Sequence, residues 1–438
     1  MGDYLSSTTE QQREMLTDIG QNSLADLYAQ VPQNLILKNG LEIPSGKSEF
    51  EISRAMTALA AKNKVFSSMF RGAGAYRHYI PAIVDAIVSK ETFLTAYTPY
   101  QAEIAQGILQ SIFEYQTMIC ELTGMDVSNA SVYDGATAAA EAAAMCRDRK
   151  RSKTLVSAAA NPEVIETLRT YCWASGYEME LIPTLDGKTD MAALAERMDE
   201  TVSGVYLAQP NYFGILEDME KAAEIIHEGK AKFIMGIHPI AAAIVKTPGE
   251  CGADIAVGEG QPLGMHLAFG GPYLGFMAAK SEFVRKLPGR MVGETTDANG
   301  NRAFVLTLQA REQHIRREKA SSNICSNQAL CAMTAAVYMA AMGAEGMKDA
   351  ARQSMGKAQY LAAELAKCGF GRVHSGAFFN EFVTTSPVPM KQLMEHLESQ
   401  GILGGLPVEE GILWCATEMN TKAEIDRLIE VLREVVNG

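Results

Sequence analysis

Residues 232–261 read KFIMGIHPIAAAIVKTPGECGADIAVGEGQ and contain two short strand-like runs, 233–237 and 254–257. Each run has the length of a buried strand and is bounded by residues that favour turns. Comparable runs lie on both sides of this stretch, near 154–158, 180–183, 204–208 and 273–278. Helix signals separate most of them. This alternation predicts an α/β fold, in which helices cover both faces of a mostly parallel sheet.

The chain on either side of this α/β region differs in character, so three parts are expected. Residues 1–64 carry helix signals, such as a capping box at Ser48–Glu51, and are expected to form an arm without a core of its own. Residues 65–320 would form the large α/β domain. Residues 321–438 combine a long Ala- and Met-rich helix, short strand-like runs and an amphipathic last helix, which fits a small α+β domain.

Composition argues against several classes of protein. The chain has 438 residues and a formal net charge of −13, so attraction to nucleic acid or to an anionic membrane is not expected. Its 8 cysteines show no C-x-x-C spacing, and neither a metal site nor a disulfide framework is expected. The longest apolar stretch, 329–342, is too short to cross a bilayer and predicts a buried helix. Without a signal segment, a cytoplasmic protein is expected.

A ligand site is expected at the carboxyl ends of the strands, where loops lead into helix N-termini. Asp134, Gly135, Ala136 and Thr137 open a predicted helix, and their size would let N–H groups reach a phosphate. The same residues equally suit an ordinary helix start with Asp134 as the N-cap. They lack the Gly-Lys-Ser/Thr of a Walker loop, and Gly72-Ala73-Gly74 lacks the third glycine of a dinucleotide fingerprint.

A series of short motifs extends along nearly the whole chain. It comprises Tyr97–Gln101, Glu103–Gly107, Gln116–Met118, Leu122–Met125, Asn129–Ser131, Asp134–Gly135, Ala138–Ala142, Gly258–Gln261, Phe269–Tyr273, Arg311–Arg317 and Ser322–Cys325. In this order and combination the motifs resemble the P-protein of the glycine cleavage system. The chain length matches the shorter, two-chain form of that family and not the fused single-chain form.

The resemblance implies a large domain of the fold-type-I pyridoxal-phosphate (PLP) kind, similar to the aspartate-aminotransferase fold. Such an enzyme needs a small-residue loop for the phosphate, an Asp beside the pyridine nitrogen and a Lys for the Schiff base. Here Asp134–Thr137 would be the loop, but His238 stands where the Asp is expected. Gln261 lies where the Lys should follow, and no lysine occurs between Lys246 and Lys280. We therefore expect a degenerate cofactor site and no PLP bound covalently by this chain.

The same resemblance implies how the chain works. We expect it to be inactive alone and to pair with glycine dehydrogenase subunit 2, which would carry the lysine and PLP. Together the two chains would decarboxylate glycine and pass the aminomethyl group to the lipoyl arm of H-protein. An α2β2 assembly is expected.

Four side chains are candidates for a pocket shared with that partner: Tyr97, Tyr100, Glu103 and Gln106. Thr98 and Gln101 have capping-box spacing and Pro99 suits the first helical position, so a helix is predicted to begin here. Side chains on its first turn would either cross the interface or merely pack the helix start.

The run from Arg311 to Lys319 is the strongest local concentration of positive charge. Within it, Arg316 and Arg317 are candidates for contact with an acidic partner such as H-protein. A solvated helix face is the competing interpretation.

Two other functions stay open at this point. A standalone PLP enzyme would use an atypical lysine, and its Schiff base would make it yellow. A non-enzymatic binding or regulatory protein would have kept the fold after losing the cofactor.

Overall fold

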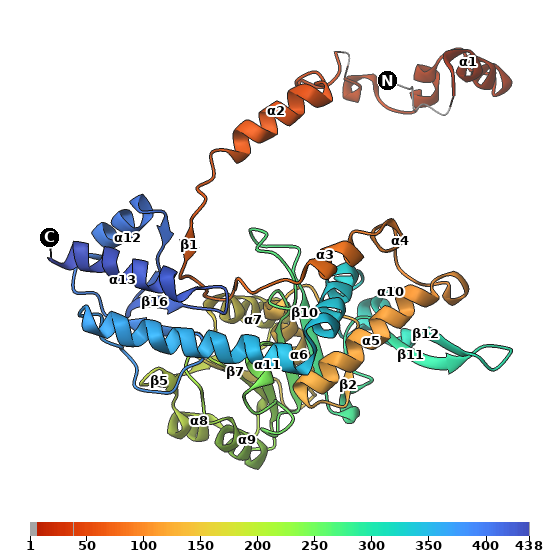
Figure 1. Ribbon diagram of the computed structural model, residues 1–438. Coiled ribbons are helices and arrows are strands. Elements are labelled where there is room, and N and C mark those ends of the chain that lie inside the picture. Colours follow the sequence, from red (N-terminus) through yellow and green to blue (C-terminus); the bar gives the residue numbers. More distant parts are fainter. Residues whose placement is uncertain (1–6, 38, 438) are drawn as a thin grey trace. The chain divides into compact units, whose positions relative to one another are not determined.

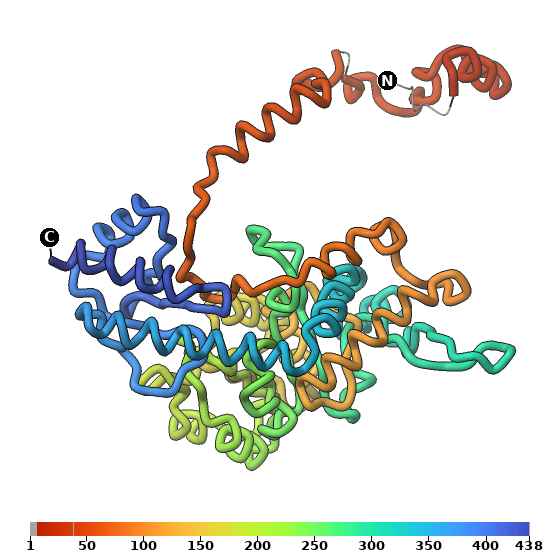
Figure 2. Tube along the Cα trace, in the orientation of Figure 1, coloured from red at the N-terminus to blue at the C-terminus, as the bar shows by residue number. Residues whose placement is uncertain are grey.

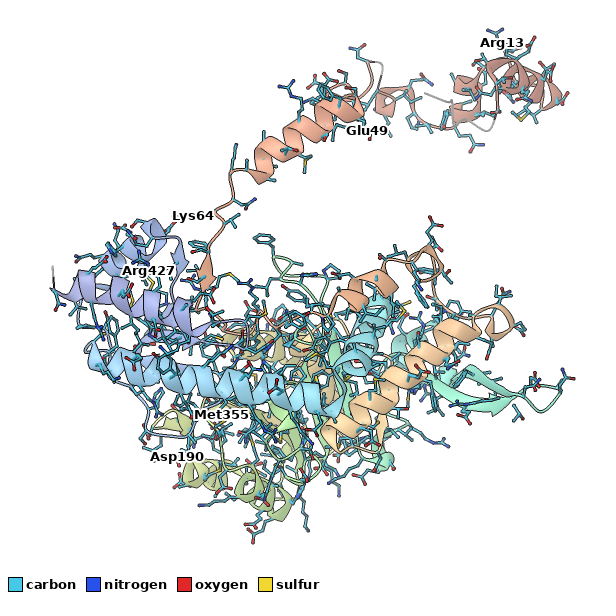
Figure 3. All side chains as sticks on the ribbon, viewed as in Figure 1. Arg13, Glu49, Lys64, Asp190, Met355 and Arg427 are labelled. Atoms are coloured by element: carbon cyan, nitrogen blue, oxygen red, sulfur yellow. The ribbon has the colours of Figure 1, made fainter. Side chains whose placement is uncertain are left out.

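The computed structural model describes residues 7–37 and 39–437. The chain divides into two compact units, Met1–Val65 and Phe66–Gly438 (Figure 1). The helices of the first unit are α1 (Thr9–Asp18), η1 (Leu24–Tyr28), η2 (Gln33–Leu35) and α2 (Glu49–Ala60). None of these helices has a buried residue, and side chains such as Arg13 and Glu49 project from them (Figure 3). The predicted capping box is confirmed, since Ser48 N–H donates to the Glu51 carboxylate at 2.9 Å.

The second unit is built on a seven-stranded sheet with the order β2-β10-β9-β8-β7-β3-β4. Its strands are β2 (Val127–Ser128), β3 (Lys153–Ser157), β4 (Met179–Ile182), β7 (Val202–Gln209), β8 (Lys232–Ile237), β9 (Ile255–Glu259) and β10 (Gly275–Ala279). β4, β3, β7, β8 and β9 run parallel, which confirms the predicted α/β fold. β10 is antiparallel to both neighbours, because residues 260–274 turn the chain back beside β9 without a crossover helix.

Helices cover both faces of this sheet. They are α5 (Gln106–Thr123), α6 (Gly135–Cys146), α7 (Pro162–Ser175), α8 (Met191–Arg197) and α9 (Met219–Glu228). In β8, Phe233, Met235 and Ile237 join the core formed with α5, α8 and α9, whereas Ile234 joins the core formed with α6 and α7. Because side chains alternate along a strand, each central strand contributes to both cores.

α11 (Ala329–Lys367) connects the sheet to the C-terminal part of the unit (Figure 1). It is interrupted at Gly343, whose φ of 62° is left-handed. In the part of the chain that the structure describes, α11 is the one helix long and apolar enough to cross a membrane. It packs into the protein instead, where Ala332, Ala335 and Tyr338 are fully buried, as predicted for a core helix.

The C-terminal part has its own small sheet and core. β13 (Glu381–Thr384), β16 (Gly411–Cys415) and β15 (Leu406–Val408) form an antiparallel sheet, and α12 (Met390–Ser399) and α13 (Lys422–Asn437) pack with α11 around the buried Trp414. β1 (Ser68–Met69), the first element of the unit, pairs with β14 (Ile402–Leu403). The start of the second unit therefore lies against its C-terminal part (Figure 2).

The remaining elements are short. They are α3 (Ala82–Val88), α4 (Glu91–Leu94), η3 (Ala102–Ile104), β5 (Thr184–Leu185), β6 (Lys188–Thr189), η4 (Ala241–Ala243), η5 (Ser281–Phe283), β11 (Met291–Thr296), β12 (Arg302–Thr307), η6 (Gln309–Arg311), α10 (Gln313–Arg316) and η7 (Arg317–Lys319). β11 and β12 form a hairpin that extends away from the sheet (Figure 1).

α5 begins at Gln106, so the prediction of a helix start at Thr98 to Gln101 is wrong. Residues 97–101 are irregular. The predicted helical face does not hold over the first turn, because Ile104 is 82% exposed, and the first fully buried side chain of the helix is Leu109. The Gln106 side chain then fixes the helix start, because it bonds to the backbone N–H and C=O of Phe304 at 2.9 and 2.8 Å.

Candidate functional site

The carboxyl ends of β8 and β9 meet the start of α6 at one edge of the sheet, where ligands bind in open α/β folds. His238 directly follows β8, and Gln261 follows β9 by two residues. The structure thus brings the sequence-predicted residues together at this edge of the sheet, and we call the region around Gly135, His238 and Gln261 the cofactor pocket. It adds two residues that the sequence analysis missed, Glu259 and Tyr76.

Glu259 places a carboxylate at the start of α6. Its Oε2 accepts a hydrogen bond from Gly135 N–H at 3.0 Å, and its Oε1 accepts from Gln261 N–H at 2.9 Å and Leu274 N–H at 3.3 Å. Burial raises the pKa of Glu259 to about 7, against the lowering effect of these three bonds. A Cβ on Gly135 would lie 2.7 Å from the Glu259 backbone nitrogen, so the helix start and the end of β9 are in contact.

The predicted phosphate loop also serves as an ordinary helix start. Asp134 caps α6, since its Oδ1 accepts from Thr137 N–H at 2.7 Å, while Ala136 is half-buried in the first turn. The helix-start interpretation is therefore confirmed, since Asp134 caps α6, while Gly135 N–H donates to the Glu259 carboxyl. The phosphate interpretation stays a prediction.

The ring of Tyr76 lies in the pocket beside His238, with 4.6 Å between the ring centroids and an edge-on angle of 66°. The Tyr76 hydroxyl donates to Oε2 of Glu381 at 2.6 Å. Gln261 holds the tyrosine backbone from the other side, because its Oε1 accepts from Tyr76 N–H and its Nε2 donates to Tyr76 C=O, both at 2.9 Å. Burial raises the pKa of Glu381 to about 7, although hydrogen bonds from Ala73 N–H and Tyr76 lower it.

His238 is a neutral imidazole that is half-buried as a residue, with its Nε2 atom buried. Its Nδ1 accepts from the N–H groups of Ile240 at 3.2 Å and Ala241 at 3.4 Å, so the ring proton lies on Nε2. Burial, and then the neighbouring His78, lower the pKa of His238 well below its usual range. Among the described residues Nε2 has no hydrogen-bond partner. A protonated pyridine nitrogen needs an acceptor, and His238 has none to offer.

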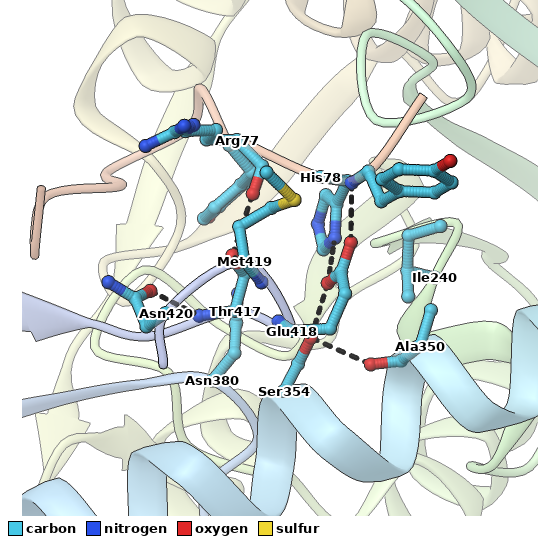
Figure 4. Close-up of polar contacts among 12 residues, drawn as sticks. Arg77, His78, Ile240, Ala350, Ser354, Asn380, Thr417, Glu418, Met419 and Asn420 are labelled. Carbon is cyan, nitrogen blue, oxygen red and sulfur yellow. Dashed lines mark hydrogen bonds and ion pairs between the residues drawn. The ribbon is translucent and has the colours of Figure 1, made fainter. Parts of the chain in front are cut away.

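The segment around Tyr76 continues into a second buried contact with the C-terminal part (Figure 4). His78 Nδ1 lies 2.8 Å from Glu418 Oε2, and Thr417 Oγ1 donates to Arg77 C=O at 2.7 Å. Ser354 on α11 also donates to Glu418, at 3.0 Å. Burial alone would raise the pKa of Glu418, but the hydrogen bond and charge of His78 bring it below its usual value.

The lysines nearest in sequence lie elsewhere. Lys280 pairs with Asp254 at 2.8 Å, at the amino end of β9 and so at the opposite edge of the sheet. Lys246 pairs with the exposed Glu220 at 2.5 Å. With Glu259 at the helix start, His238 without an acceptor and Gln261 bonded to Tyr76, the residues of this pocket do not fit PLP.

A second region contains the candidates for a shared pocket. Residues between Thr92 and Ile108 line a cavity of about 650 Å³, and among the four candidates these include Tyr97 and Tyr100 but not Glu103 or Gln106. Tyr97 is 82% exposed and Glu103 is exposed, whereas Tyr100 is held from within by Arg290, whose Nη2 donates to the Tyr100 hydroxyl at 3.1 Å. Gln106 differs from these three, because both ends of its amide already bond to β12.

The basic run from Arg311 to Lys319 forms two short helical pieces, α10 and η7, that meet at Arg317 with a φ of 54°. The run is therefore not one continuous helix, as the competing interpretation of a solvated helix face would have it. Arg311 is turned inward, where Nη1 donates to Leu287 C=O and burial lowers its pKa. Arg316 and Arg317 are exposed.

Comparison with known proteins places the chain in a family. A family model of the glycine cleavage system P-protein matches residues 2–432. The probable glycine dehydrogenase (decarboxylating) subunit 1 of Carboxydothermus hydrogenoformans is 48% identical and covers 98% of this chain and 99% of its own length. The protein of the same name from Bacillus subtilis is 46% identical, with 98% of each chain covered.

Solved structures agree. A glycine decarboxylase (P-protein) of the glycine cleavage system, in an inhibitor-bound form, superposes with a TM-score of 0.93 at 42% identity, covering 99% of this chain and 100% of that one. A sphingosine-1-phosphate lyase from Burkholderia pseudomallei (TM-score 0.67, 14% identity, 94% of each chain) shares the PLP fold-type-I architecture alone. The resemblance seen in the sequence motifs is confirmed, and the chain belongs to the P-protein family of the glycine cleavage system.

Proposed function

We propose that this chain is the subunit of a two-chain glycine dehydrogenase (decarboxylating) that carries no cofactor lysine. The observation that supports this most is the pocket beyond β8 and β9, in which Gln261 bonds to Tyr76 and none of the described lysines is bonded to a residue of the pocket. A second subunit would then hold PLP, as the words "subunit 1" in the names of relatives suggest. Together the chains would release carbon dioxide from glycine and pass the aminomethyl group to the lipoyl arm of H-protein.

The exposed segment 92–108 is the surface that we assign to the partner subunit. Tyr97 and Ile104 are each 82% exposed, which is unusual for large apolar side chains, and both line the cavity of about 650 Å³. Tyr100, fixed from within by Arg290, gives this surface a rigid aromatic group of the kind that anchors interfaces. Tyr97, Tyr100 and Glu103 would border the partner's substrate pocket, while Gln106 supports the segment from behind.

The first unit offers another apolar surface to a partner. Leu27, Phe50 and Met56 are exposed on helices that bury nothing within the unit. Helices as short as α1 and α2 are marginal in water alone, so we expect them to pack against another chain. An α2β2 assembly would cover both surfaces.

Arg316 and Arg317 are the exposed cations that we assign to H-protein, and they lie close to the segment 92–108, since the rings of Tyr100 and His314 are 6.5 Å apart. The net charge of −13 and the eight free cysteines fit a complex in the cytoplasm.

The test is to purify this chain alone and together with the lysine-bearing subunit, both supplied with PLP. We expect the lone chain to be colourless, and the pair to absorb near 410–430 nm and to exchange the carboxyl carbon of glycine with bicarbonate. A borohydride-reducible PLP bond on the lone chain would contradict the proposal in favour of a standalone enzyme. Stable pairing without any exchange would instead favour a binding or regulatory protein.

A further inference from the structure

The start of α6 is built to stabilise an anion. The first N–H groups of a helix have no partner within it, and the helix dipole adds positive potential there. Glu259 supplies a carboxylate 3.0 Å from Gly135 N–H. Among the described residues no lysine or arginine bonds to Glu259, so the helix start and two further N–H groups hold it. Glu259 is half-buried, so its carboxyl is stabilised by these N–H groups in place of a cation.

An aromatic ring occupies the space beside His238. The Tyr76 ring lies edge-on to the imidazole, whose unpartnered Nε2 is fully buried. Phe379 packs on the same imidazole, with 5.6 Å between ring centroids. The tyrosine hydroxyl donates to Glu381, so Tyr76 needs no ligand to complete its bonding, and His238 Nε2 faces rings instead of an acceptor.

The segment that carries Tyr76 is shaped to enter this pocket. A Cβ on Gly72 would lie 2.5 Å from Glu381 Oε1, and a Cβ on Gly74, with its φ of 110°, would lie 2.6 Å from Asn161 Nδ2. Between these glycines Ala73 N–H donates to Glu381 at 2.6 Å. The two glycines, which suggested a nucleotide fingerprint in the sequence, therefore allow the backbone to approach β13 and α7.

Gln261 connects Glu259 and Tyr76. Its backbone N–H donates to Glu259, and its side-chain amide makes both bonds to the backbone of Tyr76. The position at which a lysine is expected is thus occupied by a residue that fixes the carboxylate and the ring relative to each other.

We infer that this chain fills its own cofactor pocket permanently, with the Glu259 carboxylate in place of a phosphate at the start of α6 and the Tyr76 ring in place of a pyridine beside His238. Restoring a lysine at Gln261 would not be enough to restore cofactor binding. The inference concerns this chain alone and does not depend on its partner or its reaction.

The first part of the inference, that the Glu259 carboxylate takes the place of a phosphate, can be tested by replacing the carboxylate with a free ion. In the full chain, Glu259→Ala removes the anion and leaves the helix start exposed. We expect inorganic phosphate to raise the melting temperature of this variant by roughly 2–4 °C beyond the effect of chloride at equal ionic strength. Glu141→Ala is the matched control, because Glu141 is also buried on α6 but lies in the middle of the helix. If phosphate shifts Glu259→Ala no more than wild type and Glu141→Ala, the inference is overturned.

The second part, that the Tyr76 ring takes the place of a pyridine, needs a probe that cannot react with surface lysines. We choose 4-deoxypyridoxine 5′-phosphate, which lacks the aldehyde of PLP. By equilibrium dialysis, Tyr76→Ala/Glu259→Ala should bind it at least about tenfold more tightly than wild type and than Glu259→Ala alone. Equal affinity of all three proteins would overturn the assignment of Tyr76 as the ring substitute.

If the alanine variants do not fold, two more conservative substitutions can be used. Glu259→Gln keeps an acceptor but removes the charge, and Glu141→Gln is its control. We expect hydrogen exchange to accelerate at least about tenfold in peptides containing residues 135–137 and 74–79 of Glu259→Gln only, because Gln261 links the two segments. Unchanged exchange in both peptides would refute the link between Glu259 and Tyr76.

Discussion

Glu381→Gln should change how the stability of the second unit depends on pH. Glu381 is buried, its Oε1 accepts from Ala73 N–H at 2.6 Å and its Oε2 accepts from Tyr76 at 2.6 Å, with no cation in these contacts. Its pKa rises from the usual 4.5 to about 7 on folding because burial disfavours the charged form. A group whose pKa is raised in the folded state contributes stability that is fully present below pH 4.5 and is lost as pH rises towards 7.

The size of the effect follows from that span. At about 1.4 kcal/mol for each pH unit, the rise from 4.5 to about 7 amounts to about 3 kcal/mol of unfolding free energy. Wild type should lose this amount, relative to Glu381→Gln, between pH 4.5 and 7.5. Because glutamine stays neutral throughout, the variant should be relatively most favoured at the alkaline end.

Urea unfolding across this pH range measures the difference. Trp414 is a suitable fluorescent reporter, since it is fully buried on β16 and pairs with Phe382 of β13, next to Glu381. Glu224→Gln, on the exposed side of α9, is the control and should follow wild type at every pH. Parallel curves for wild type and Glu381→Gln would refute the reasoning, because they would mean that the buried carboxyl takes up no proton on folding.

Three further substitutions have expected outcomes. Gly135→Ala should lower the unfolding free energy by about 1–3 kcal/mol in chemical denaturation, because its Cβ would lie 2.7 Å from the Glu259 backbone nitrogen. Its control is Gly356→Ala on α11, which should be neutral or stabilising by up to about 1 kcal/mol because no atom lies within 4 Å of the new Cβ. Tyr97→Ala should leave the melting temperature of the lone chain unchanged, since the side chain is 82% exposed. It should weaken binding of the second subunit by about tenfold in titration calorimetry. An unchanged affinity would show that Tyr97 does not lie in the interface. Gln106→Ala should destabilise by about 1–3 kcal/mol through the loss of both hydrogen bonds to β12, with faster hydrogen exchange in the β11–β12 hairpin as its signature.

The sheet could be predicted because its signal is local. Runs such as 233–237 are short, apolar and bounded by turn residues, and the corresponding strand, β8, is observed at Lys232–Ile237. Caps are local too, so Asp134 was assigned correctly as the N-cap of α6. The predicted start of α5 was wrong because Thr98 and Gln101 have the spacing of a capping box, although residues 97–101 are irregular and the helix begins at Gln106. The division of the second unit near residue 320 stays a prediction.

Sequence patterns could not predict which residues fill the pocket. The missing lysine and the histidine after β8 indicate that the site is degenerate, but they do not indicate what replaces the cofactor. Tyr76 reaches Glu381 across 305 residues of sequence, and Gly135 reaches Glu259 across 124. Spacing rules describe neighbours along the chain, so contacts of this separation leave no periodic signal. The two glycines of Gly72-Ala73-Gly74 were the one visible sign, since glycine often marks a close backbone approach.

The pairing of β1 with β14 also sets the order in which this protein is completed during synthesis. Ser67 Oγ donates to Gly401 C=O, a partner 334 residues further along the chain. At about 5–20 residues per second, a ribosome needs roughly 20–70 s to make that partner after Ser67. Phe70, fully buried in the finished protein, is without most of its core during that interval, because the side chains that surround it come from residues 215 to 432. The segment from Ser67 to Tyr76 is therefore made early but packs only after its partners have been made, and Phe70 is open to chaperones until then.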